Sequence, residues 1–204
     1  MGTSLAIEAS GLTKRFGDVF AVNDLSLNIH RGEIYGFLGL NGAGKTTTIR
    51  MLLGMIKPST GTVSLFGTKV EPGRKGIWQR VGYMVETPHA YPDLTVRENL
   101  EIFRRLRQLK NAGSVEKIIE QMGLAPYANR RAGILSLGNA QRLGLAKALI
   151  HHPDLLLLDE PANALDPAGI VEVRNLLLGL AQNVFDALKC RRNSGEILRL
   201  ARRR

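Results

Sequence analysis

The sequence lacks the features that mark secreted or membrane-spanning chains. Cys190 is the only cysteine among 204 residues, which excludes an intrachain disulfide or a cysteine-built metal cluster and fits a reducing compartment. The N-terminal MGTSLAIEAS has neither the basic start and apolar stretch of a secretory signal nor the myristoylation pattern. No apolar run approaches the roughly 18 residues that a membrane span needs. We therefore expect a cytoplasmic protein, whose membrane role would come through a partner.

The charge of the chain is strongly positive but uneven. The formal net charge is +10, which by itself would suggest an anionic partner. Seven of the 28 basic residues, however, fall within positions 189–204. Because most of the excess is local, the charge says little about the folded body, and we expect no specific nucleic-acid partner.

Short apolar or alternating segments separated by turns predict a strand-rich body. Ile34–Leu38 is a nearly continuous apolar run, which is typical of a strand buried on both faces. A helix-compatible segment, 45–55, follows it and stops at Lys57-Pro58. Further strands are expected at 5–9, 19–29, 62–66, 81–85 and 155–158.

A helical block interrupts this body at about 88–150. Residues 95–109 have apolar residues spaced for one helical face, and Thr95 with Glu98 forms a capping-box pattern at their start. Residues 115–122 and 136–150 predict two more helices. After the block, residues 167–181 predict a helix with proline in its first turn.

Residues 39–46 fit the phosphate-loop pattern G-x-x-x-x-G-K-[ST], with an apolar strand before them and a helix after them. The glycines let backbone N–H groups point at phosphates, and the helix N-terminus favours an anion. Lys45 would neutralise the β- and γ-phosphates, and the Thr46 hydroxyl would ligate Mg²⁺. The alternative, a chance match in a glycine-rich turn, is weakened by the flanking elements. The predicted ATP site comprises Gly39, Asn41, Gly42, Ala43, Gly44, Lys45, Thr46 and Thr47.

Two carboxylates follow the apolar run Leu155–Leu158. A buried strand that ends in Asp159 and Glu160 places negative charge at the sheet edge, where such enzymes bind their metal. Asp159 would hold Mg²⁺, and Glu160 would polarise the attacking water. Taken alone, the pair could equally be a solvated acidic turn; together with the phosphate loop it favours an ATPase.

Residues 135–142 read LSLGNAQR, just upstream of the acidic strand. They resemble the LSGGQ signature of ABC transporter ATP-binding subunits, in the S-L-G variant of the drug- and bacitracin-export type. The resemblance covers residues 3 to about 182. It implies an α/β fold: a P-loop NTPase core with N-terminal antiparallel β strands and an inserted α-helical subdomain. It also implies that Ser136, Gly138, Asn139 and Gln141 contact ATP held by a second subunit, in a head-to-tail homodimer or with a paired ATPase subunit.

Further site positions are carried over from the same family. Phe16 stands where an aromatic residue stacks on adenine, although a phenylalanine beside Gly17 could equally belong to the core. Glu86 stands where the family has a glutamine that contacts Mg²⁺ and senses the γ-phosphate, and glutamate can also bind a hard cation. Asp166 belongs to a segment that resembles the loop crossing the dimer interface. The helical subdomain would meet a transmembrane permease subunit at the inner face of the cell membrane.

The resemblance ends near residue 182. The family continues with another central strand and a switch histidine, whereas no histidine follows His152 here, and His151 and His152 are expected at an exposed helix end. Loss of that strand would leave two central strand edges unpaired unless residues 184–188 replace it. We hypothesise that 183–204 is a truncated or out-of-frame basic tail that replaces the family's own sequence. A genuine basic tail that contacts anionic lipid or RNA remains the alternative.

The sequence thus predicts an ATP- and Mg²⁺-dependent ATPase that drives transport, in the export direction, through a separate membrane partner. Two other functions stay open. One is a soluble ABC ATPase acting on ribosomes or DNA, although its usual second domain or long insertion is not seen. The other is an impaired remnant that binds nucleotide without turnover.

Overall fold

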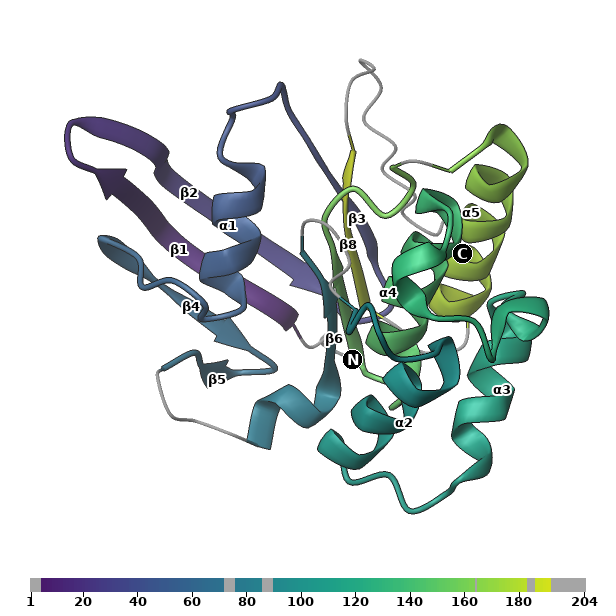
Figure 1. Ribbon diagram of the computed structural model, residues 1–204. Coiled ribbons are helices and arrows are strands. Elements are labelled where there is room, and N and C mark those ends of the chain that lie inside the picture. The colour runs from purple at the N-terminus through teal and green to yellow at the C-terminus, as the bar shows by residue number, and fades with distance from the viewer. Residues whose placement is uncertain (1–4, 72–75, 86–89, 164, 183–185, 192–204) are drawn as a thin grey trace.

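The computed structural model describes residues 5–71, 76–85, 90–163, 165–182 and 186–191 (Figure 1). Within these residues no helix is both long and apolar enough to cross a bilayer. The strands, in chain order, are β1 (Leu5–Phe16), β2 (Val19–His30), β3 (Ile34–Leu38), β4 (Thr60–Leu65), β5 (Thr68–Lys69), β6 (Val81–Met84), β7 (Leu155–Leu158) and β8 (Asp186–Arg191). The helices are α1 (Lys45–Leu52), η1 (Gly76–Arg80), α2 (Val96–Leu106), α3 (Gly113–Gln121), η2 (Ala125–Tyr127), η3 (Ala132–Ile134), α4 (Leu137–Leu149) and α5 (Pro167–Gln182).

The strands form two sheets of different kinds. The N-terminal sheet has the order β2-β1-β4-β5 with antiparallel neighbours, and the second sheet has the order β3-β8-β7-β6 with parallel neighbours. In Figure 1 helix α1 lies over the first sheet, and the helices α2 to α5 gather on the other side of the molecule. This arrangement confirms the predicted α/β class with antiparallel strands at the N-terminus.

Strand β8 lies in the middle of the parallel sheet, between β3 and β7. Its residues pair in register with both neighbours: Leu188 stands opposite Tyr35 of β3 and opposite Leu157 of β7. The gap expected from the sequence is therefore filled by the segment after α5, at Asp186–Arg191, which includes 186–188 of the predicted 184–188; residues 184 and 185 lie outside the described residues. Residues 192–204 of the predicted tail lie outside the described residues.

Strand β3 differs from its prediction because it is the edge of the described parallel sheet. Its residues are half buried and Gly36 is exposed, whereas all four residues of β7 are buried. The apolar run Ile34–Leu38 was expected to be buried on both faces, and that expectation was wrong. An apolar run reports that a segment is a strand, but its place in the sheet decides how much of it is covered.

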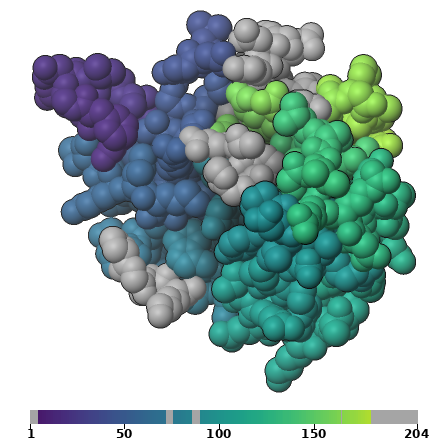
Figure 2. All heavy atoms as spheres, in the orientation of Figure 1, coloured from purple at the N-terminus to yellow at the C-terminus, as the bar shows by residue number. Residues whose placement is uncertain are grey.

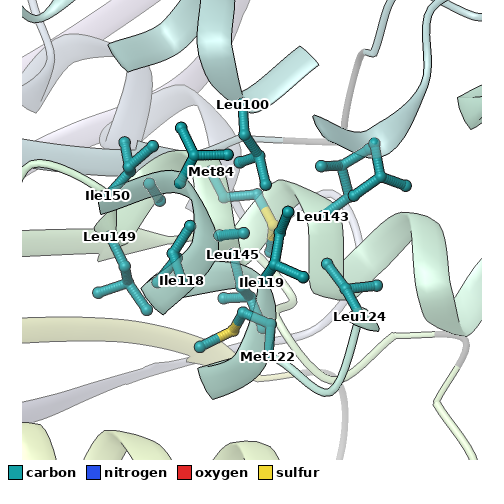
Figure 3. Packing of buried hydrophobic residues seen from close by; sticks show 14 of the residues in the cluster. Met84, Leu100, Ile118, Ile119, Met122, Leu124, Leu143, Leu145, Leu149 and Ile150 are labelled. Carbon is teal, nitrogen blue, oxygen red and sulfur yellow. The ribbon is translucent and has the colours of Figure 1, made fainter. Parts of the chain in front are cut away.

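The predicted helices α2, α3 and α4 pack around one apolar cluster. The capping box at the start of α2 is present: the Thr95 hydroxyl accepts from the Glu98 N–H, and the Glu98 carboxylate accepts from the Thr95 N–H. Figure 3 shows the cluster's side chains converging from the three helices and β6. Burial of each leucine or isoleucine side chain stabilises the folded state by about 1.5–3 kcal/mol. The labelled members are Met84, Leu100, Ile118, Ile119, Met122, Leu124, Leu143, Leu145, Leu149 and Ile150.

The helices join the parallel sheet around the carbonyl of Val81, the first residue of β6. Arg107, at the end of α2, donates to this oxygen at 3.3 Å and to the carbonyl of Trp78. The His151 Nε2 lies 3.1 Å from the same Val81 oxygen. The two histidines after α4 were expected at an exposed helix end; this holds for His152 but is wrong for His151, whose Nδ1 is buried. Helix α2 and the residues after α4 are thus anchored to one strand.

Gly82 allows α4 to approach β6 closely, which leads to a first prediction. A Cβ at Gly82 would lie 2.2 Å from the Ala148 carbonyl oxygen and 2.8 Å from Pro153, while a Cβ at Gly36 of β3 would meet nothing within 4 Å. We expect Gly82→Ala to lower the free energy of unfolding by about 1–3 kcal/mol, as overpacking does. Gly36→Ala, the matched strand glycine, should change it by less than about 0.5 kcal/mol. Equal urea midpoints for both variants would contradict the close approach.

His151 leads to a second prediction, on pH. Burial, and next the positive charge of Arg107, lower the pKa of the His151 imidazole to about 4 from 6.5. As the pH falls from 6.5 to 4, the unfolded chain takes up a proton at this position before the folded chain does, so folding becomes less stable. Because water still reaches part of the ring, we expect a loss on the order of 1 kcal/mol.

Replacement of His151 by glutamine keeps a donor for the Val81 carbonyl and removes the titration. We expect the free energy of unfolding of His151→Gln, measured in urea at pH 7 and pH 4.5, to fall less with acid than that of the wild type. His152→Asn is the exposed control and should follow the wild type. A His151→Gln curve parallel to the wild type would refute the assignment.

Candidate nucleotide-binding site

The loop between β3 and α1 has a backbone that only glycine fits. Gly42 and Gly44 have φ values of 82° and 80°, which residues with a Cβ rarely adopt. At Gly44 the requirement is also steric, since a Cβ would lie 2.0 Å from the Ala21 carbonyl oxygen of β2. The two glycines let the loop curl directly into α1, whose N-terminal N–H groups favour a bound anion.

Lys45, the first residue of α1, points back over this loop. Its side chain is buried, and its Nζ donates to the carbonyl oxygens of Gly39 and Leu40 at 2.8 Å each. An ammonium group held by two backbone carbonyls of the loop places a positive charge where a phosphate can approach.

Thr46 joins the phosphate loop to the acidic end of β7. Its Oγ1 donates to Asp159 Oδ2 at 2.5 Å, and Asp159 is 5% exposed. The described residues contain no group of three or more histidine, cysteine or acidic side chains that could hold a metal by themselves. A hydroxyl and one carboxylate in contact nevertheless fit Mg²⁺, which takes one or two protein oxygens and completes its shell with substrate phosphates and water.

Glu160 follows directly and has a strained backbone. Its φ is 48°, a left-handed value that a residue with a side chain adopts at some energetic cost. Local contacts hold it there: the Asn163 N–H donates to the Glu160 carbonyl at 3.0 Å, and the Asn163 side-chain amide lies 3.4 Å from the Glu160 carboxylate. Asn163 thus contacts both the backbone and the carboxylate of Glu160 within the same loop.

These groups share one open pocket of about 210 Å³. The structure therefore brings six of the eight predicted phosphate-loop residues together with Glu160, without Gly39 and Ala43, and Asp159 is in contact through Thr46. Its lining consists of Ala21, Asn41, Gly42, Gly44, Lys45, Thr46, Thr47 and Glu160.

The predicted signature residues lie at the start of α4. The exposed Ser136 caps this helix, because its Oγ accepts from the Asn139 N–H at 3.3 Å. Gly138 and Asn139 are half buried. Gln141 is 5% exposed, and its Nε2 donates to the carbonyl of Glu160 in the same chain at 3.2 Å. None of these four residues lines the described pocket, and the Gln141 side chain is buried against the acidic loop of its own chain.

Of three other predicted positions, Phe16 and Asp166 do not line the pocket, and Glu86 is not among the described residues. Phe16 ends β1 at the tip of the β1–β2 hairpin, which projects in purple in Figure 2. It is 54% exposed with the Lys14 Nζ 5.1 Å from its ring centre, so the alternative that it belongs to the core was wrong. Asp166 precedes α5 and accepts from the Gly169 N–H at 2.8 Å. Glu86 lies outside the described residues.

Sequence reasoning missed two residues of the site. Asn163 belongs to the segment 163–166 that resembles the loop crossing the dimer interface, and no contact with Glu160 was predicted for it, although a spacing of three residues is that of a turn contact. Ala21 carries no signal, since only the folding of β2 against the phosphate loop brings its carbonyl to Gly44.

Comparison with known proteins identifies the family. The family model for the ABC transporter matches residues 22–163. The chain is 47% identical over 179 residues to the bacitracin transport ATP-binding protein BcrA of Bacillus licheniformis, covering 88% of this chain and 58% of the relative. It is 44% identical over 164 residues to the Nod factor export ATP-binding protein I of Burkholderia lata, covering 79% of this chain and 54% of that protein. The chain therefore spans a little over half the length of these relatives.

A solved structure of an ATP-binding subunit of an ABC transporter superposes with a TM-score of 0.83 at 25% identity, covering 92% of this chain and 79% of the other. A nucleotide-free ATP-binding cassette with 22% identity superposes with a TM-score of 0.81, which supports the fold alone. The family model, the relatives and the fold agree with the resemblance found in the signature and the phosphate loop. This chain belongs to the ABC transporter family.

Proposed function

We propose that this chain is the ATP-binding and ATP-hydrolysing part of a transporter and powers export through a separate membrane partner. The observation that carries the proposal is the Thr46–Asp159 contact, which sets the phosphate loop beside Asp159, next to the carboxylate of Glu160 in the pocket lining. Phosphoryl transfer needs little more from a protein than positioned charges and a positioned water.

The binding step falls to the phosphate loop. Backbone N–H groups of the Gly42–Gly44 turn and the N-terminus of α1 favour the β- and γ-phosphates. Lys45 would leave its carbonyl partners at Gly39 and Leu40 and donate to phosphate oxygens, which are stronger acceptors. Phe16, exposed at the hairpin tip, is available to stack on the adenine ring.

The hydrolytic step falls to the acidic strand end. Thr46 and Asp159 would hold Mg²⁺, with Glu86 as a further ligand, and the ion would neutralise charge on the transferring phosphoryl group. Glu160 would accept a hydrogen bond from the attacking water and orient it toward the γ-phosphate. The position of Glu160 in the pocket lining supports this role, and its contact with the Asn163 amide limits the motion of the carboxylate.

The partners are inferred from the relatives. BcrA and the Nod factor protein are named for the transport of bacitracin and the export of Nod factor. By analogy, a transmembrane permease would receive the motion of the helices α2 to α4, at the inner face of the membrane. A second copy or a paired ATPase subunit would bring Ser136, Gly138 and Asn139 to the nucleotide, from the exposed start of α4.

The third prediction is a loss of turnover with retained binding. We expect Glu160→Gln to lower the ATPase kcat of the chain by about 10²-fold or more, because a general base contributes that much. Its ATP affinity should stay within about threefold of wild type, because the phosphate loop is unchanged. Steady-state phosphate release and ATP titration calorimetry measure the two quantities.

Glu120→Gln, an exposed carboxylate on α3, is the matched control and should retain full activity. If the wild type releases phosphate no faster than Glu160→Gln, the chain is a nucleotide-binding remnant and the proposed turnover is refuted. If neither protein binds ATP, the whole proposal fails.

A further inference from the structure

Gln141 has an environment that nucleotide contact alone does not explain. It lies one turn inside α4, whose first residues are on the surface: Leu137 is 72% exposed, whereas Gln141 is 5% exposed. A long amide side chain is seldom buried so fully unless its polar atoms have partners. Here the Nε2 has one, the Glu160 carbonyl oxygen at 3.2 Å.

The acceptor of this bond is the backbone carbonyl of Glu160, whose carboxylate is proposed to orient the attacking water. The Glu160 carbonyl accepts twice, from the Asn163 N–H within its own loop and from Gln141 on a different element. Two donors use both lone pairs of a carbonyl oxygen and fix the plane of its peptide. The carbonyl carbon and the side chain are both bonded to the Cα of Glu160, so holding this peptide limits the directions that the side chain can take.

The two contacts differ in what they connect. Asn163 joins the acidic loop to itself, over three residues, through both its N–H and its side-chain amide. Gln141 joins that loop to α4, 19 residues earlier, and α4 is packed into the helical cluster through Leu143, Leu145 and Leu149. The Gln141 amide therefore ties the backbone of Glu160 to a helix that is itself held in the apolar cluster.

We propose that Gln141 is a positioning residue for ATP hydrolysis, whose buried amide donates to the Glu160 carbonyl and so aims the Glu160 carboxylate into the nucleotide pocket. The inference rests on the proposed function, because it needs Glu160 to orient the attacking water. It assigns to Gln141 a task within its own subunit. Loss of the bond leaves the phosphate loop, Lys45 and Thr46 in place, so it affects turnover and not nucleotide affinity.

The test begins with Gln141→Met, which keeps the length of the side chain and removes the donor. We expect kcat to fall by about tenfold or more, as small misplacements of a catalytic group do, with KM and ATP affinity within about threefold of wild type. Gln121→Met, an exposed glutamine on α3, is the matched control and should change none of these quantities. A Gln141→Met enzyme with wild-type kcat would overturn the proposal.

A second variant gives a readout that packing alone would not move. The carboxyl group introduced by Gln141→Glu is isosteric with the amide, repels the Glu160 carbonyl when ionised and donates to it when protonated. We expect kcat relative to wild type to be lowest near pH 8 and to recover as the pH falls toward 6, with half-recovery at the pKa of the new carboxyl group. A ratio of kcat values that does not change with pH would also overturn the proposal, even if Gln141→Met fails to fold.

The two levels of failure are distinguishable in the same assay. A wild-type rate no higher than that of Glu160→Gln refutes hydrolysis itself, and the positioning role with it. A wild-type rate well above Glu160→Gln, together with full activity of both Gln141 variants, refutes the positioning role alone.

Discussion

The hydrogen bond from Thr46 to Asp159 joins two segments that are 113 residues apart in the chain. It forms because β3 and β7 run parallel in one sheet, so that their carboxyl ends reach the same edge. The phosphate loop leaves β3 at that edge, and the acidic pair leaves β7. The proposed roles of the pocket depend on this meeting point, since a Mg²⁺ held there would have to contact both the protein oxygens and the phosphates of a nucleotide bound by the loop.

Strand β8 lies between β3 and β7 and so sets the separation of the phosphate loop from the acidic pair. Without it, β3 and β7 would each present an unpaired edge in the middle of the sheet, and buried N–H or carbonyl groups left unpaired cost about 1–3 kcal/mol each. The chain supplies β8 from the segment after α5, and the strand pairs along its length with both neighbours. The parallel sheet is therefore continuous among the described strands.

The helical side of the molecule is bound to the site by a few directed contacts. Arg107 and His151 both reach the Val81 carbonyl, Gly82 lets α4 lie close against β6, and Gln141 reaches the Glu160 carbonyl. A movement of α4 would therefore displace contacts at β6 and at Glu160, directly after β7. If the proposed function holds, these links could transmit the effect of hydrolysis at the pocket to α4.

Much of this site could be predicted from the sequence because its chemistry is local. The phosphate loop, its flanking strand and helix, and the capping box at Thr95 depend on residues within a few positions of one another, and all of them are present. The acidic pair was found by its place after a buried strand.

Other features depend on contacts that no local pattern encodes. The half-buried state of β3, the burial of His151, the approach of Ala21 to Gly44 and the inward direction of Gln141 are set by which elements pack together. Strand β8 was predicted only as a conditional replacement, because its apolar pattern is weak: a charged residue at each end leaves little periodicity. Its pairing with two neighbouring strands decides its structure instead.

The central claim is that Thr46 and Asp159 together make the metal half of a nucleotide site. Calorimetric titration with ATP, in the presence of Mg²⁺ and then of EDTA, measures this directly. The account predicts that Mg²⁺ strengthens binding to the wild type by about tenfold or more, and that Asp159→Asn loses this gain while its metal-free affinity stays within about threefold. An equal gain from Mg²⁺ in both proteins would contradict the account, because the ion would then be held elsewhere.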